Sequence, residues 1–157
     1  MKKNMNLMAL CLGAAVTAFA ADATVPASTN NQPLSVQIAG EARTAGKLAA
    51  DLTGALSRKN ADLTNVGESV ATIEKSLTSI EGLIGQLDAS RATMTAPQIA
   101  QLDRMKQVNE IMQVVFKNKK ELASATGEEA RQQLRAHALM VKQRAELIEK
   151  SAKRIGS

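Results

Sequence analysis

The chain of 157 residues contains no tryptophan, no tyrosine, one cysteine and one histidine. The cysteine, Cys11, lies in an N-terminal segment that we expect to be removed on export, so the mature chain would form no disulfide. A single histidine without a thiol cannot supply the usual zinc clusters or thiol chemistry, and no nucleophile and base can be paired. The scarcity of aromatic side chains, two phenylalanines in the whole chain, also argues against nucleic-acid binding by base stacking. We therefore predict no catalytic residue, no metal site, no bound cofactor and no enzymatic activity.

The single histidine, His137, is the one candidate for holding a cofactor. It lies next to the apolar stripe of the last predicted helix, where a histidine in a four-helix bundle can ligate haem. The sequence has neither a Cys-x-x-Cys-His motif nor a Glu-x-x-His motif, and it offers no aromatic lining for a haem. We expect His137 to lie in solvent or at the edge of the core, with haem binding as the alternative.

The first twenty residues, 1–20, have the pattern of a secretory signal peptide. Two lysines precede an apolar run over residues 7–19, and small residues stand at Ala18 and Ala20, the positions that signal peptidase reads. The run is shorter than the about 20 residues of a membrane span. A lipid-modified Cys11 is an alternative, but Leu10 stands where a small residue is needed. We predict cleavage after Ala20, a periplasmic or secreted protein, and no membrane span afterwards.

The remaining chain divides into a short lead-in and one domain. Residues 21–33 are polar, include two prolines and have little to bury, which predicts a flexible lead-in. Residues 34–157 are enough for a single helical domain. Their apolar residues recur at steps of three and four, the period of an amphipathic helix. The most regular stripe comprises Leu63, Val66, Val70, Ile73, Leu77, Ile80, Ile84 and Leu87.

Three further stretches share this helical period, at residues 34–56, 99–122 and 134–155. Thr95 with Gln98 and Thr126 with Glu129 have capping-box spacing, so each pair predicts the start of a helix. Asn109 is expected at the edge of the third stripe. Alanine and glycine are dense from residue 39 to residue 50, which predicts close packing of the first helix against the second. We predict an all-α fold, an up-and-down antiparallel bundle of about four helices, with an elongated helical hairpin or coiled coil as the alternative.

One short segment resembles a known pattern. Residues 94–102, Met-Thr-Ala-Pro-Gln-Ile-Ala-Gln-Leu, are similar to the helix-opening Leu-Thr-x-x-Gln signature of small periplasmic all-α chaperones and stress adaptors. That family carries the signature twice, whereas the segment from Thr126 to Glu129 lacks both the leucine and the glutamine. The resemblance implies an exported, chaperone-like helical protein, but it covers nine residues and assigns no family.

Charge is distributed unevenly along the chain. The net charge is +5 overall, and residues 21–103 carry −3 whereas residues 104–157 carry +6. The two halves of a bundle can complement each other, or the basic half can form a face for an anionic partner. On the last helix an apolar set lies away from the core stripe, beside basic residues. The partner-contact candidates are Leu139, Met140, Leu147, Arg135 and Lys142.

These features predict an exported, non-enzymatic helical protein that acts by contact with a protein or with the envelope surface. An adaptor, a structural subunit and a holdase-type chaperone all fit this description. The expected partner is another protein or an anionic envelope component, and a homodimer is possible on the same surface. A small-ligand carrier that holds haem or a lipid is the alternative, because methionines such as Met105 and Met112 line the predicted core.

Overall fold

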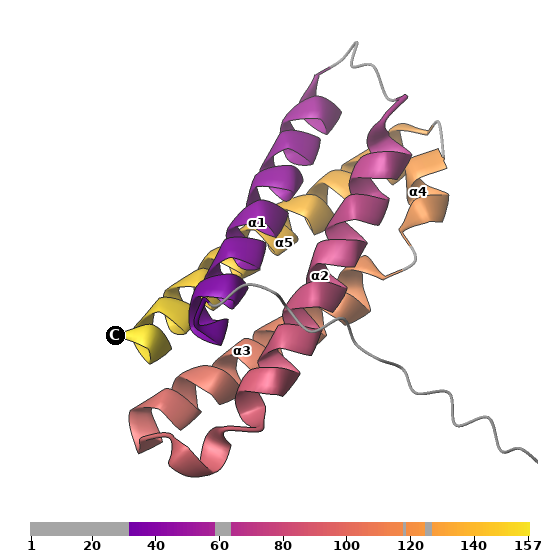
Figure 1. Ribbon diagram of the computed structural model, residues 1–157. Coiled ribbons are helices and arrows are strands. Elements are labelled where there is room, and N and C mark those ends of the chain that lie inside the picture. Colours follow the sequence, from indigo (N-terminus) through magenta and orange to yellow (C-terminus); the bar gives the residue numbers. More distant parts are fainter. Residues whose placement is uncertain (1–31, 59–63, 118, 125–126) are drawn as a thin grey trace, which may run out of the picture. The chain divides into compact units, whose positions relative to one another are not determined.

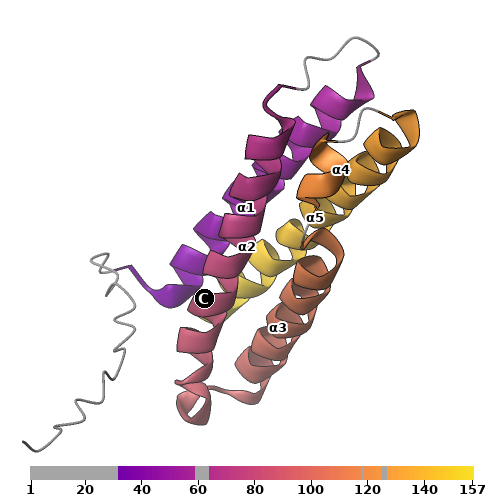
Figure 2. The same ribbon diagram turned by 90° about the vertical axis from the view of Figure 1, so that its right-hand side faces the viewer.

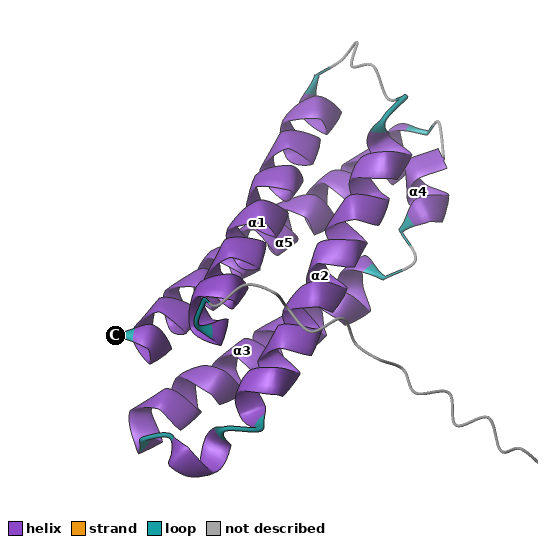
Figure 3. Cartoon of the chain, viewed as in Figure 1, coloured by secondary structure: helices purple, strands orange, loops and turns teal. Residues whose placement is uncertain are grey.

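The computed structural model describes residues 32–157 apart from 59–63, 118, 125 and 126 (Figure 1). The predicted signal peptide and most of the lead-in therefore lie outside the described residues, as do Leu63 and Thr126. Figure 3 shows helices joined by short connections. The elements are α1 (Leu34–Ser57), α2 (Val66–Asp88), the 3-10 turn η1 (Arg91–Thr93), α3 (Ala96–Phe116), α4 (Lys120–Ser124) and α5 (Glu128–Gly156).

The four long helices pack as an antiparallel ring. α1 contacts α2, α2 contacts α3, α3 contacts α5, and α5 returns to α1, as the two views in Figures 1 and 2 show. Gly46 lies beside Ala145 while Ser35 lies beside Gly156, so α1 and α5 run in opposite directions. The predicted all-α class and up-and-down bundle are confirmed, with the short α4 as a fifth helix that contacts α2 and α5.

The predicted stripe of α2 forms one wall of the core. All seven of its described members are buried, from Val66 to Leu87. The stripe of α5 is equally accurate, since each residue predicted to face inward is buried, from Leu134 to Ile155. In both helices the three-and-four spacing of apolar residues decided which face turns inward, because that spacing keeps the side chains on one side of the helix.

The prediction for α3 was wrong in two respects. We expected one helix to continue to Leu122, but α3 ends at Phe116, where Lys117 turns to an extended conformation and α4 follows separately. Lysines at this point suit the negative end of the α3 dipole and favour a helix end. The buried line of α3 also runs through Asn109, which is in the core and not at its edge. That line comprises Leu102, Met105, Asn109, Met112 and Phe116.

The helix starts were predicted with mixed success. At α3 the capping box is confirmed, and the Thr95 N–H donates to Gln98 Oε1 at 2.9 Å. At α5 the N-cap is Gly127, one residue later than the predicted Thr126, which lies outside the described residues. Glycine is accepted at an N-cap because its backbone is unhindered, and Glu128 then occupies the first turn, where the helix dipole favours a carboxylate.

The close approach predicted for α1 falls on α5 and not on α2. A methyl group built on Gly46 would lie 3.4 Å from the Cβ of Ala145. Small residues therefore face one another across this pair of helices, which lets the two backbones come together. The small residues of the α5 stripe are Ala138, Ala145 and Ala152.

We expect Ile73→Asp to lower the free energy of unfolding by about 4 kcal/mol or more, because it buries an unpaired carboxylate at the centre of the α2 stripe. Ser79→Asp places the same group on the exposed side of α2 and should change stability by about 0.5 kcal/mol or less. Urea unfolding followed by circular dichroism measures both. Equal stabilities of the two variants would contradict the assignment of this stripe to the core.

A second pair of variants tests the contact between α1 and α5. Gly46→Leu should destabilise the bundle by about 1–3 kcal/mol, because the new side chain meets Ala145 and must push the helices apart. A methyl group built on Gly54 of the same helix would meet nothing within 4 Å beyond its own stretch of helix. Gly54→Leu should therefore raise the free energy of unfolding by up to about 1 kcal/mol through its better helix propensity. Thermal unfolding compares them, and a Gly46→Leu variant as stable as Gly54→Leu would show that the helices are not closely packed.

Candidate functional site

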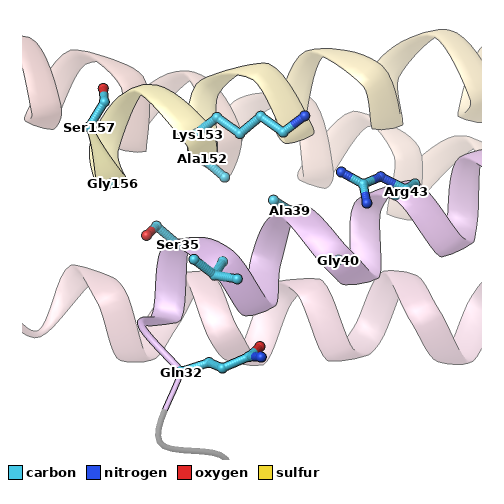
Figure 4. A pocket seen from close by; sticks show the side chains of 10 residues that line it. Gln32, Ser35, Ala39, Gly40, Arg43, Ala152, Lys153, Gly156 and Ser157 are labelled. Atoms are coloured by element: carbon cyan, nitrogen blue, oxygen red, sulfur yellow. The ribbon is translucent and has the colours of Figure 1, made fainter.

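Two hollows follow the seam between α1 and α5, and Arg43 lines both of them. The first has a volume of about 390 Å³ and lies where α1 begins and α5 ends (Figure 4). The second, of about 260 Å³, continues along the seam. We call the two together the α1–α5 groove. Besides Arg43, the groove is lined by Gln32, Ser35, Val36, Ala39, Gly40, Ala42, Gly46, Lys47, Ala50, Lys142, Glu146, Glu149, Ala152, Lys153, Gly156 and Ser157.

The floor of the groove is formed by residues with small side chains or none. Seven of the lining residues are alanine or glycine. Among them, Gly46 and Gly156 lie directly against the neighbouring helix, so the feature that joins the helices also leaves space above their contact. Val36 adds an apolar side chain that is 48 % exposed. The groove thus combines a small apolar floor with a charged border.

One carboxylate holds two of the cations that border the groove. Glu149 accepts from Lys153 Nζ at 2.7 Å and from Arg43 Nη2 at 2.8 Å. The hydrogen bonds from Lys153 and then Arg43 hold the pKa of Glu149 below its ordinary value, so it is ionised at neutral pH. Figure 4 shows the Arg43 and Lys153 side chains extending toward each other. This cluster links α1 to α5 and fixes where the two positive charges lie.

Two further cations border the second hollow without such a partner. Lys47 from α1 and Lys142 from α5 line the hollow, and neither makes an ion pair with any residue that the structure describes. Glu146 lines the same hollow. Arg43, Lys47, Lys142 and Lys153 together outnumber Glu146 and Glu149, so the groove carries an excess of positive charge that attracts anionic groups.

The five predicted contact residues do not form one patch. Leu139 is 41 % exposed, with Arg135 four residues before it and Lys142 three residues after it on the same side of α5. Met140 packs partly against the hydrophobic core, and Leu147 is half-buried. Both lie about 80–100° around the helix from Leu139 by helical geometry. Lys142 alone among the five lines the α1–α5 groove.

Sequence reasoning did not single out Arg43, Lys47, Lys153 or Val36. Arg43 and Lys47 are four residues apart and therefore share one side of α1. Their role depends on which helix lies beside that side, and the sequence was interpreted with α2 as the close neighbour. Pairing the small residues of the first and last helices would have brought these cations together with Lys142.

The candidate cofactor residue, His137, is half-buried on α5. Its Nδ1 atom is buried without a hydrogen-bond partner among the described residues. Burial, and then the nearby charge of Lys119, lower the pKa of His137 below its ordinary value of 6.5. Within the described part of the chain, no group of three or more histidine, cysteine, aspartate or glutamate side chains is arranged to hold a metal ion.

Comparison of the chain with protein-family models, with curated proteins and with solved structures finds no match. Among the described helices, none has both the length and the hydropathy needed to cross a lipid bilayer.

The environment of His137 predicts how stability depends on pH. Because the folded-state pKa is lowered, the unfolded chain takes up a proton near pH 6.5 that folded His137 does not. Stability contributed by neutral His137 is therefore present above pH 6.5 and declines as the pH falls below it. We expect the free energy of unfolding, measured with urea at about pH 7.5 and about pH 5.5, to differ less between the two pH values for His137→Gln than for the parent protein. Identical pH dependence in both would contradict the burial of this imidazole.

Proposed function

We propose that this chain is an exported, non-enzymatic binding protein whose α1–α5 groove holds an acidic segment of another protein. In this role it acts as an adaptor or a holdase-type chaperone in the periplasm or outside the cell. The observation that carries the proposal is the groove itself, which has a small apolar floor bordered by four cations, two of them without an ion-pair partner among the described residues.

The chemistry of the groove favours a polypeptide as its partner. An extended or helical segment can lay small apolar side chains on the floor of alanine and glycine and place carboxylates beside Lys47 and Lys142. The exposed side chain of Val36, which lines the first hollow, adds an apolar contact. The signal peptide predicted from residues 1–20 supplies the proposed location.

Aggregation of a chemically denatured acidic client tests this function. The full chain should suppress light scattering at a stoichiometric ratio, because the groove captures acidic segments before they associate. The double variant Lys47→Glu with Lys142→Glu should need about tenfold more protein for the same effect, since it places like charges opposite the client. The matched control, Lys75→Glu with Arg104→Glu, makes the same charge change at exposed positions of α2 and α3 outside the groove and should behave as the parent.

Circular dichroism of both double variants establishes that the helices are retained. Failure of the parent to suppress aggregation would contradict the proposal, as would equal loss in both variants, which would reflect net charge alone. Binding to vesicles that contain phosphatidylglycerol, without any effect on the client, would identify an anionic lipid surface as the partner in place of a protein.

A further inference from the structure

Glu149 is the covered member of the charged cluster in the α1–α5 groove. Its side chain is 18 % exposed, whereas the side chains of Arg43 and Lys153 are 65 % and 57 % exposed. Arg43 lines both hollows, Lys153 lines the first and Glu149 lines the second. The carboxylate is therefore held in the seam by two cations that remain open to solvent, and one of these cations borders the whole groove.

Three N–H donors converge on a single oxygen of this carboxylate. Glu149 Oε1 accepts from Arg43 Nη2 at 2.8 Å and from Arg43 Nε at 3.2 Å, and Lys153 Nζ lies 2.7 Å from it. Charge-assisted donors from α1 and α5 thus surround one anionic oxygen, which is how a carboxylate is bound in proteins generally. The chain's own Glu149 therefore engages the cations that an acidic segment in the groove would otherwise bind.

The contact with Glu149 leaves Arg43 able to exchange partners. A guanidinium pairs best with a carboxylate when two of its N–H groups meet two separate oxygens, but here Nε and Nη2 donate to the same oxygen. Ion pairs that involve exposed side chains also contribute little to stability, because water competes for them. A carboxylate of a bound segment can therefore offer Arg43 two oxygens and replace Glu149 at little cost to the fold.

We infer that Glu149 is an internal competitor of the acidic segment that the α1–α5 groove binds, an inference that rests on the proposed function. In the free protein Glu149 holds Arg43 and Lys153. In the complex a carboxylate of the segment binds Arg43 in its place. Glu146 has no such role, since it lines the second hollow but makes no ion pair with any residue that the structure describes.

This competition determines which segments the groove retains. A single carboxylate gains at Arg43 little more than Glu149 already supplies there. A segment with several carboxylates replaces Glu149 and also reaches Lys47 and Lys142, which border the second hollow. Glu149 thus makes the groove select segments with several acidic residues over those with one.

Fluorescence anisotropy of the full chain with a labelled peptide of ten glutamates measures the competition. Glu149→Gln should tighten binding by about threefold to tenfold, because it frees Arg43 and Lys153 while keeping the size of the side chain. The matched control is Glu146→Gln, which removes the same charge from the same groove and should change the affinity by about twofold or less. Glu149→Asp should also tighten binding, since the shorter side chain withdraws from Arg43 without changing the net charge.

A double-mutant cycle tests whether Glu149 acts through Arg43. In a chain that carries Arg43→Gln, the change Glu149→Gln should tighten binding by a smaller factor than in the parent, because one of the two released cations is then absent. Circular dichroism of each variant establishes that the helices are retained. An equal gain with and without Arg43 would overturn the inference.

The remaining outcomes separate this inference from the proposed function. Equal tightening in Glu149→Gln and Glu146→Gln would overturn the inference, because net charge alone would explain both. Unchanged or weaker binding in Glu149→Gln would overturn it as well, and the proposed function would stand if Lys47→Glu with Lys142→Glu still weakened binding of the peptide. If neither the parent nor Glu149→Gln binds the peptide, the proposed function fails and the inference fails with it.

Discussion

The contact between α1 and α5 is the constraint on which the other interactions of the bundle depend. Gly46 and Ala145 bring the two helices together, and dispersion attraction between close backbones is effective only when no larger side chain intervenes. The antiparallel register set by this pair places Arg43 beside Glu149, 2.8 Å from Nη2 to Oε1. The same register puts Ser35 beside Gly156 at the end of the pair. The α1–α5 groove is a direct consequence of this packing.

Helix ends are then joined across the bundle by long polar side chains. Arg131 at the start of α5 donates through Nε to the Leu56 carbonyl at 2.8 Å and also to the Arg58 carbonyl, which satisfies the C-terminal end of α1. Gln98 at the start of α3 donates through Nε2 to the Ile155 carbonyl at 3.1 Å near the end of α5. Carbonyl groups in the last turn of a helix lack partners within that helix. These side chains therefore stabilise the ring of helices and the individual ends together.

Periodicity predicted the elements better than it predicted their neighbours. Ile73 and Val141 were placed in the core correctly because a three-and-four step defines a helix face without reference to the rest of the chain. Asn109 was misplaced because an apolar pattern favours Val108 and Val115, whereas the packed line of α3 follows geometry through the asparagine. The α1–α5 groove required knowing which helix lies beside Arg43, and that is a tertiary property. Capping boxes locate helix ends, but they do not say which helices become neighbours.

Glycine has opposite consequences on the two sides of the bundle. At Gly46 the missing side chain is filled by the neighbouring helix, with 3.4 Å to the Ala145 Cβ, and the contact stabilises the fold. At Gly85 no other described atom lies within 4 Å of the same position, and the space remains a hollow. Asn109 lies near that hollow at a core position, 3 % exposed, and its buried Oδ1 has no partner among the described residues, which costs about 1–3 kcal/mol. The α1–α5 side therefore carries the close packing, whereas the α2–α3 side keeps open space beside Gly85.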